Sequence, residues 1–360
     1  MRACQQHVLK IILLALVFIH IGIFSLSARK VASIVICAET GTIHHEQNAD
    51  AITHPASLTK MMTLFMTFQA LRNGKLKLDQ KLPVSKHATK QIPCKLWLKA
   101  GSTITVRQAI LAMITKSAND AAVVLAETLG KGTESQFAKA MTQQARKLGM
   151  IKTVFKNSSG VPNKHQITTA RDMAILSRAL YKHFPDYFPL FKTEKFVHKG
   201  VVHANHNKLL GKVKGVDGIK TGFINASGFN LAASMVRDNR RIIAVVMGGE
   251  TAKARDKKMI HLLETTHAAI KGKKQVHPND EYASLDDLLF ALGAAGTYGD
   301  PKEIKKADYQ AELIESKYTS VNDLLEIINE EEPTKKKARP KVIRTKKVKS
   351  KSRKNRLHRV

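Results

Sequence analysis

The apolar residues of the chain follow two spacings, and each spacing fills its own part of the sequence. The first strand-like run of β-branched residues spans Val31 to Cys37, and a turn at Gly41 separates it from His44 and His45. This pattern predicts a β-hairpin. Three more strands are predicted over residues 215–219, 230–236 and 242–247, and the last two form a second hairpin.

Between these two strand regions, apolar residues recur every three or four positions, as on the buried face of a helix. Ser57 opens the first such segment and Gly74 ends it. Thr105 caps the second helix, which is predicted over residues 106–115. Further helices are predicted over residues 120–129, 134–148, 169–181 and 252–270. The sheet therefore draws its strands from both ends of the chain, with helices inserted between them.

The first residues have the layout of an export signal. Arg2 and Lys10 precede an apolar stretch over residues 11–24, and small residues follow up to Ala28. We predict a signal peptide over residues 1–28, cleaved after Ala28. An uncleaved anchor is the alternative, because His20 interrupts an apolar run that is long for a signal. Both alternatives export the body of the protein to the periplasm or cell envelope.

The formal net charge of +31 is distributed unevenly along the 360 residues. Residues 334–360 hold 14 lysines or arginines and no acid, whereas residues 280–333 hold 14 acids and four lysines. We predict an acidic segment with two short helices over residues 274–333 and a disordered basic tail over residues 334–360. Because export separates the tail from nucleic acid, its expected partner is an anionic envelope surface. Plain solvation is the alternative.

Three short motifs carry the candidate chemistry, and they occur in one order. Ser57-Leu58-Thr59-Lys60 comes first, Ser117-Ala118-Asn119 second and Lys220-Thr221-Gly222 third. A lysine three residues after a serine on a helix lies one turn further on the same face, so the two side chains can touch. The serine hydroxyl becomes a nucleophile only when a base takes its proton. The first motif therefore predicts a nucleophile beside its base.

Lys60 can accept a proton only in its neutral form. Because the reference pKa of lysine is about 10.4, the site has to lower it strongly. Burial and a second positive charge nearby both lower the pKa of an amine. Lys220 is the candidate for that second charge.

The order and spacing of the three motifs are similar to those of the active-site serine penicillin-recognising enzymes. Their flanks resemble the low-molecular-mass D-alanyl-D-alanine carboxypeptidases, over residues 54–63, 116–121, 168–174 and 218–223. The resemblance runs from about Val31 to about Lys273 and implies a catalytic domain over residues 29–273. The fold implied is α+β: an antiparallel sheet flanked by helices, with an all-helical lobe beside it and the active site between them.

The resemblance also implies a reaction. Ser57 would attack the penultimate D-Ala of a peptidoglycan stem peptide and form an acyl-enzyme, and Lys60 would accept its proton. Ser117 would relay that proton to the departing D-Ala. The backbone N–H groups of Ser57 and Phe223 would form the oxyanion hole. β-Lactams would acylate the same serine, and no cofactor is implied.

The remaining motif residues would bind substrate. The resemblance implies that Asn119 hydrogen-bonds the substrate amide, while Lys220 and Thr221 hold the terminal carboxylate. Gly222 would let the substrate backbone approach the strand without a side chain in the way. Arg255 could add a further positive charge for the carboxylate, but we do not include it in the predicted site.

Other chemistry-bearing residues fit the predicted reaction less well. His44-His45-Glu46 and the pair His203 and His206 lack a metal-ligand spacing, so no metal is expected. An exported pair of cysteines is compatible with a disulfide, but nothing in the sequence places Cys94 beside Cys37. We favour two separate buried residues and leave the disulfide as the alternative. The resembling family usually has glycine in place of Ala118 and serine in place of Cys94.

Competing functions remain open on the sequence. A peptidoglycan endopeptidase has the same motifs, and a non-catalytic wall-binding protein would use the cleft only to bind. Class A β-lactamases use a glutamate to activate the deacylating water, but no Glu-x-x-Leu-Asn occurs between Asn119 and Lys220. We therefore expect β-lactams to acylate Ser57 and to remain attached.

Overall fold

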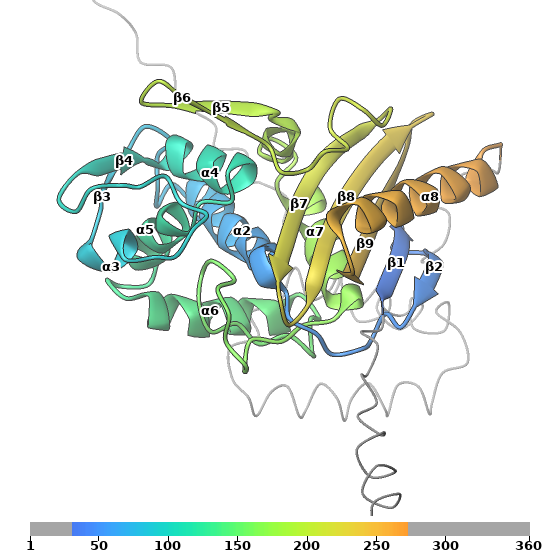
Figure 1. Cartoon of the computed structure of the whole chain (residues 1–360), viewed down its shortest axis with the longest axis horizontal. Helices are drawn as coiled ribbons and strands as arrows, with labels where there is room; N and C mark the ends of the chain where they lie inside the picture. Colours follow the sequence, from blue (N-terminus) through green and yellow to red (C-terminus); the bar gives the residue numbers. More distant parts are fainter. Residues whose placement is uncertain (1–30, 273–360) are drawn as a thin grey trace, which may run out of the picture. The chain divides into compact units, whose positions relative to one another are not determined.

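The computed structural model describes residues 31–272 and is built on a five-stranded sheet of order β2-β1-β9-β8-β7 (Figure 1). Each neighbouring pair is antiparallel. The strands are β1 (Ala32–Cys37), β2 (Ile43–Gln47), β7 (Val216–Ile224), β8 (Gly228–Arg237) and β9 (Arg240–Gly249). Pairing between β1 and β9 joins the two hairpins, which confirms that the sheet draws strands from both ends of the chain.

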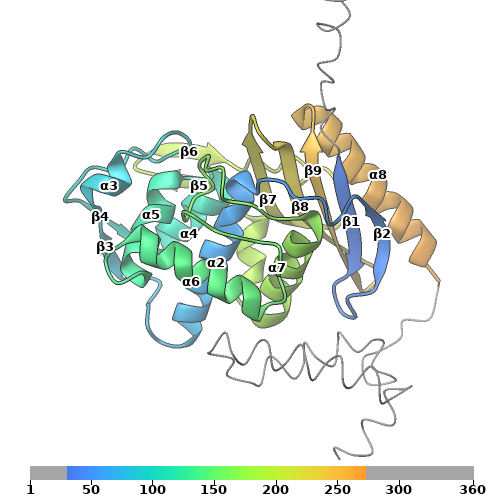
Figure 2. The same ribbon diagram turned by 90° about the horizontal axis from the view of Figure 1, so that it is seen from below.

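Helices cover both faces of the sheet (Figure 2). The helix α8 (Ala252–Ile270) packs on one face, and α2 (Thr59–Arg72) and α7 (Ala170–His183) lie on the other. The side chains of β9 explain this arrangement, because successive residues of a strand point to opposite faces. Ile243 and Val245 belong to the core on the α2 and α7 side, whereas Ala244 and Val246 belong to the core under α8.

A second lobe lies beside the sheet and consists mainly of helices (Figure 1). Its helices are α3 (Lys86–Thr89), α4 (Val106–Thr115), α5 (Asn119–Leu129) and α6 (Glu134–Lys147). Two small hairpins accompany them, β3 (Lys81–Pro83) with β4 (Thr103–Thr105) and β5 (Lys195–His198) with β6 (Val201–Ala204). The α+β fold is confirmed, although the lobe predicted to be all-helical contains the β3–β4 hairpin.

Several boundaries differ from the sequence predictions, and two of the differences concern the first and third motifs. Ser57 lies in a short 3₁₀ turn, η1 (Ala56–Leu58), directly before α2. The strand β7 continues five residues beyond the predicted end at Ile219, so it contains Lys220, Thr221 and Gly222. A second 3₁₀ turn, η2 (Phe188–Lys192), precedes β5.

No helix within residues 31–272 is long and apolar enough to cross a membrane. The predicted signal peptide, the acidic segment and the basic tail lie outside the described residues.

Candidate active site

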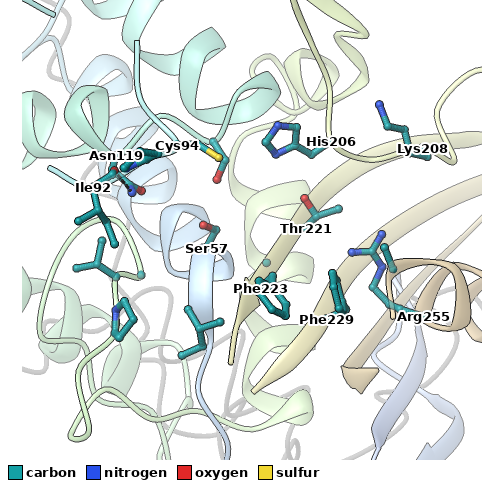
Figure 3. Close-up of a pocket in the computed structure, with 18 of the residues that line it drawn as sticks. Ser57, Ile92, Cys94, Asn119, His206, Lys208, Thr221, Phe223, Phe229 and Arg255 are labelled. Carbon is teal, nitrogen blue, oxygen red and sulfur yellow. Dashed lines mark hydrogen bonds between the residues drawn. The ribbon is translucent and has the colours of Figure 1, made fainter. Parts of the chain in front are cut away.

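The three motifs converge on one cavity of about 440 Å³ between the sheet and the helical lobe. The predicted residues Ser57, Ser117, Asn119, Thr221, Gly222 and Phe223 line it. The two predicted lysines are buried behind this lining, with Lys60 0% and Lys220 1% exposed. Figure 3 shows Ser57 between a wall that carries Ile92 and Asn119 and a wall that carries Thr221 and Arg255.

Two glycines hold the backbone of the serine turn in place. Gly160 has φ +88°, and a Cβ on it would lie 1.8 Å from the carbonyl oxygen of Ala56. A Cβ on Gly222 would lie 3.0 Å from the backbone nitrogen of Ser57. The structure therefore gives Gly222 a packing role against the backbone of Ser57, which the sequence analysis did not foresee. The backbone of the serine turn therefore lies directly against Gly222 on β7.

Lys60 is held by three oxygen atoms. Its Nζ lies 3.2 Å from Ser57 Oγ, 2.7 Å from Asn119 Oδ1 and 2.6 Å from the carbonyl oxygen of Ser159. Burial lowers the pKa of Lys60 well below its usual range, and the charge of Lys220 lowers it further. These are the two causes that the sequence suggested.

A neutral lysine amine has two N–H donors and one lone pair. The amide oxygen of Asn119 and the carbonyl of Ser159 can only accept hydrogen bonds, so they take the two N–H groups of Lys60. Its lone pair is then left for the hydroxyl of Ser57, which can donate. The geometry orients the base toward the nucleophile.

The contact from Ser159 was missed by the sequence analysis. It comes from a loop whose backbone is fixed by buried hydrogen bonds. Thr63 Oγ1 donates to the carbonyl oxygen of Ser158 at 2.6 Å, and Glu134 Oε1 accepts from the backbone N–H of Ser158 at 2.9 Å. Asn157 Oδ1 accepts from the N–H of Gly160 at 2.7 Å. The polar run over residues 157–160 is the only trace of this loop in the sequence.

Ser117 lies between α4 and α5 with φ +60°, a left-handed conformation that is uncommon outside glycine. Its Oγ is buried and has no hydrogen-bond partner within the described part of the chain. An unpartnered buried hydroxyl is unfavourable unless an incoming group satisfies it. Its position in the cavity wall leaves it available to a bound substrate.

The side chain of Asn119 already has protein partners at both ends. Its Oδ1 accepts from Lys60, and its Nδ2 donates to the carbonyl oxygen of Ile92 at 2.8 Å. Its backbone N–H donates to the carbonyl oxygen of Cys94 at 2.7 Å. Asn119 therefore links Lys60 to the loop over residues 92–94, which lines the cavity.

The opposite wall is cationic. Lys220 Nζ donates to the carbonyl oxygen of Thr221 at 2.9 Å, and burial lowers the pKa of Lys220 to about 7. Arg255 on α8 also lines the cavity, although we left it out of the predicted site. Its guanidinium is paired with Asp256 and lies 3.3 Å from the carbonyl oxygen of Asn230.

His206 was likewise absent from the predicted site but lines the cavity. Burial and the neighbouring charges, led by Lys220 and Lys116, lower its pKa to about 4. Its imidazole is therefore neutral near pH 7. The sequence analysis considered His206 only as a metal ligand together with His203, and nothing in that pattern places its ring at the cavity.

Cys37 and Cys94 are both free, as predicted. Both are half-buried, however, and so the expectation that they are buried is wrong. Within residues 31–272, no group of three or more His, Cys, Asp or Glu side chains is placed to hold a metal ion.

Ser57 lies in a 3₁₀ turn before a buried helix, Lys60 is buried one turn further on, and Lys-Thr-Gly lies on an edge strand. This is the arrangement of motifs shared by the active-site serine penicillin-recognising proteins. The model of the D-alanyl-D-alanine carboxypeptidase family matches residues 25–251, and the chain belongs to this family.

Two curated relatives and one solved structure illustrate the similarity. The chain is 35% identical to the D-alanyl-D-alanine carboxypeptidase DacA of Escherichia coli (strain K12) over 278 residues, 75% of this chain and 68% of that protein. It is 33% identical to DacF of Bacillus subtilis (strain 168) over 242 residues, 65% of this chain and 61% of the relative. Penicillin-binding protein D2 of Listeria monocytogenes, in its ampicillin-bound form, superposes with a TM-score of 0.57 at 34% identity, covering 68% of this chain and 98% of that one.

The chain thus spans about three fifths of the length of its Bacillus subtilis relative.

Proposed function

We propose that this protein is a serine D-Ala-D-Ala carboxypeptidase that removes the terminal D-Ala from peptidoglycan stem peptides through an acyl-enzyme. One observation carries the proposal: the buried amine of Lys60 has two obligate acceptors, and its remaining bonding position faces Ser57. Family membership and the names of the relatives support the same reaction.

Acylation begins with the Ser57 hydroxyl. Lys60 Nζ takes its proton while Oγ attacks the carbonyl carbon of the penultimate D-Ala. Negative charge then develops on the carbonyl oxygen, which the N–H groups of Ser57 and Phe223 stabilise. Each such donor typically lowers the barrier by about 3 to 4 kcal/mol. The close approach of Gly222 to the Ser57 backbone supports this pair of donors, because Phe223 is the next residue on β7.

The departing D-Ala needs a proton on its amine. Lys60 holds the proton taken from Ser57, and Ser117 Oγ faces the same cavity without a partner of its own. We assign the relay to Ser117: its hydroxyl donates to the leaving nitrogen and is reprotonated by Lys60 as the C–N bond breaks. Water attacks the acyl-enzyme in the second half of the reaction, with Lys60 again as base.

The terminal carboxylate lies at the cationic wall. Thr221 lines the cavity there, with Lys220 buried beneath it and Arg255 beside it. A carboxylate near Lys220 favours its protonated form and opposes the effect of burial on its pKa. Binding of the substrate therefore restores positive charge to Lys220 where that charge is needed.

The cavity also explains the expected fate of β-lactams. Among the described residues that line it, Asp256 alone carries a carboxylate, and this is paired with Arg255. Activation of water against a bulky β-lactam acyl group therefore depends on Lys60 alone, without the additional carboxylate that class A β-lactamases use, and we expect it to be slow. The ampicillin-bound Listeria monocytogenes relative supports the view that β-lactams acylate this class of cavity.

The test combines a D-Ala-D-Ala pentapeptide with a fluorescent penicillin. We expect release of D-Ala and a stable adduct that peptide mapping places on Ser57. The Ser57→Ala variant should lose both, whereas Ser102→Ala, a serine outside the cavity, should keep both. Rapid hydrolysis of the penicillin would indicate a β-lactamase, and faster cleavage of cross-linked dimers than of pentapeptide would indicate an endopeptidase. Peptide cleavage by Ser57→Ala would contradict the proposal.

We also propose that the enzyme acts in the cell envelope, after removal of residues 1–28, and that residues 334–360 bind anionic surfaces. The 14 cations of the tail support this second point, because each cation near an anionic membrane adds about 1 kcal/mol of attraction. The full chain should sediment with phosphatidylglycerol vesicles in low salt. A variant with glutamine at the 14 tail positions should remain in solution. Equal sedimentation of the two would contradict a role for the tail.

A further inference from the structure

We propose that Cys94 is a modification site: its thiol exchanges with small disulfides that carry carboxylates, and the resulting adduct reversibly blocks acylation of Ser57. The inference rests on the proposed function, because the blocked step is the attack by Ser57.

Cys94 lies in the loop over residues 92–94 that lines the cavity beside Ser57. It lines the same cavity as Ser57 and is half-buried, so a small reagent that enters the cavity can reach it. The loop around it is anchored to the start of α5. Asn119 donates to the carbonyl oxygens of Ile92 and Cys94, and the Asp120 carboxylate accepts from the backbone of residues 96 and 98.

The thiol lies within electrostatic range of both catalytic lysines. A negative charge on Cys94 raises the pKa of Lys60 and also that of Lys220. A thiolate formed at Cys94 therefore lies beside two buried amines. Thiolate, and not thiol, is the species that attacks a disulfide.

The cavity also has room and a polar partner for an incoming group. Ser117 lines the cavity and is only 4% exposed. Its Oγ has no hydrogen-bond partner among the described residues. This orphan hydroxyl can bind a polar atom of whatever occupies the space above Ser57. Cys94 and His206 line this space, and Figure 3 shows both on the same side of Ser57.

Charge selects the class of disulfide. Lys208 and Arg255 line the cavity, and Lys220 lies just behind it, whereas Asp256 is already paired with Arg255. Such a cationic cavity concentrates anions and repels cations. A disulfide that carries carboxylates should therefore react faster than one that carries amines.

The exchange is balanced without another oxidant. Cys94 releases its proton to solvent, and the thiolate sulfur attacks one sulfur of the disulfide. A new S–S bond forms as the old one breaks, and the departing thiolate takes up a proton. A free thiol such as dithiothreitol reverses the exchange. While the adduct is present, it fills the space through which a substrate carbonyl reaches Ser57.

Cys37 provides a matched control within the molecule. It lies at the end of β1, away from the cavity lining, and contacts with His44 and Thr40 outweigh its burial and lower its pKa to about 7. A disulfide should therefore modify Cys37 readily. Modification there should leave the access to Ser57 unchanged.

The experiment uses the full chain in a Cys4→Ser background, with Cys37→Ser or Cys94→Ser added. Each variant is treated with oxidised glutathione or with cystamine, mapped by mass spectrometry and then reacted with fluorescent penicillin. In Cys37→Ser, we expect a glutathione adduct on Cys94 and a fall of about tenfold or more in the labelling of Ser57, reversed by dithiothreitol. Oxidised glutathione should modify Cys94 several-fold faster than cystamine does.

In Cys94→Ser, a glutathione adduct on Cys37 should not change the rate at which fluorescent penicillin labels Ser57, compared with the same variant before treatment. Full occupancy of Cys94 with unchanged labelling would overturn the proposal, and so would an unmodified Cys94 under conditions that modify Cys37. Faster reaction with cystamine would overturn the assigned class of disulfide. If untreated protein takes no penicillin, the proposed function fails, while the mass measurement still decides whether Cys94 is a modification site.

Discussion

On the helical side of the cavity, a buried lysine with a lowered pKa lies between two carbonyl-type oxygens, whereas on the strand side a buried lysine lies near a buried arginine. Lys60 and Lys220 are equally inaccessible to water, and burial lowers both pKa values. Their neighbours differ. The partners of Lys60 orient a lone pair, while Lys220 and Arg255 form the cationic wall that we propose as the site of the terminal carboxylate. Burial alone therefore does not determine the role of a cation.

The largest effect is expected from changing the base. In Lys60→Gln, the Ser57 hydroxyl has no proton acceptor, and loss of general-base catalysis should slow penicillin acylation by about 10² to 10⁴-fold. Lys60→Arg is the informative partner, because it keeps the positive charge but cannot become neutral. Stopped-flow labelling measures both variants, with circular dichroism as the check on folding. An active Lys60→Arg protein would show that a neutral amine is not required.

The next effect concerns the loop that supplies Ser159 to Lys60. In Gly160→Ala, the new Cβ would lie 1.8 Å from the carbonyl oxygen of Ala56, so the serine turn has to move. We expect a loss of about 3 kcal/mol in the free energy of unfolding, together with slower acylation.

Gly132→Ala is the matched control for this loop. Gly132 has a similar φ of +89° but nothing within 4 Å of its Cβ position. That variant should lose only about 1 kcal/mol from backbone strain. Urea denaturation measures both variants, and equal losses would mean that the clash with Ala56 is unimportant.

The cationic wall should respond to Arg255→Met. Removing the guanidinium should raise KM for a D-Ala-D-Ala peptide by about tenfold to a hundredfold, because a charged hydrogen bond contributes about 1.5 to 3 kcal/mol. A peptide amide that lacks the terminal carboxylate should be much less affected. Equal effects on the two substrates would place Arg255 in folding and not in carboxylate binding.

The smallest effect is expected in the pH dependence of kcat/KM for the D-Ala-D-Ala peptide, on the alkaline side of the profile. Lys220 binds the carboxylate in its charged form, and its pKa of about 7 in the free enzyme means that this charge is lost as the pH rises. We expect kcat/KM for the peptide to fall by about fivefold between pH 7 and pH 8, since free-enzyme ionisations shape kcat/KM. The peptide amide should lack this limb. A limb of the same size for both substrates would assign it to another group.

Local patterns were enough to predict most of the scaffold. The β-branched runs predicted the strands because their side chains fill both faces of a covered sheet. The spacing of Ser57 and Lys60 predicted their contact because one helical turn separates them. The motifs also predicted Ser117 and Lys220 at one cavity, since three ordered motifs restrict the arrangement more than any one of them does.

The missed parts depend on contacts between segments distant in sequence. Ser159 contributes a backbone carbonyl, which no side-chain pattern reveals. Arg255 is one of several cations on α8, and only the packing of that helix brings it to the cavity. Gly222 was predicted correctly as part of the cavity, but its packing against Ser57 requires knowledge of where the serine turn lies.

The pairing of β1 with β9 has a consequence for how the enzyme is made. Ala32 on β1 lies opposite Met247 on β9, so about two hundred residues must be available before the central sheet can form. Contacts of such long range delay folding. A newly made chain therefore cannot complete its central sheet until β9 has been synthesised. The turn that carries Ser57 packs against β7 of this sheet, so it reaches its final position only after the last strand has arrived.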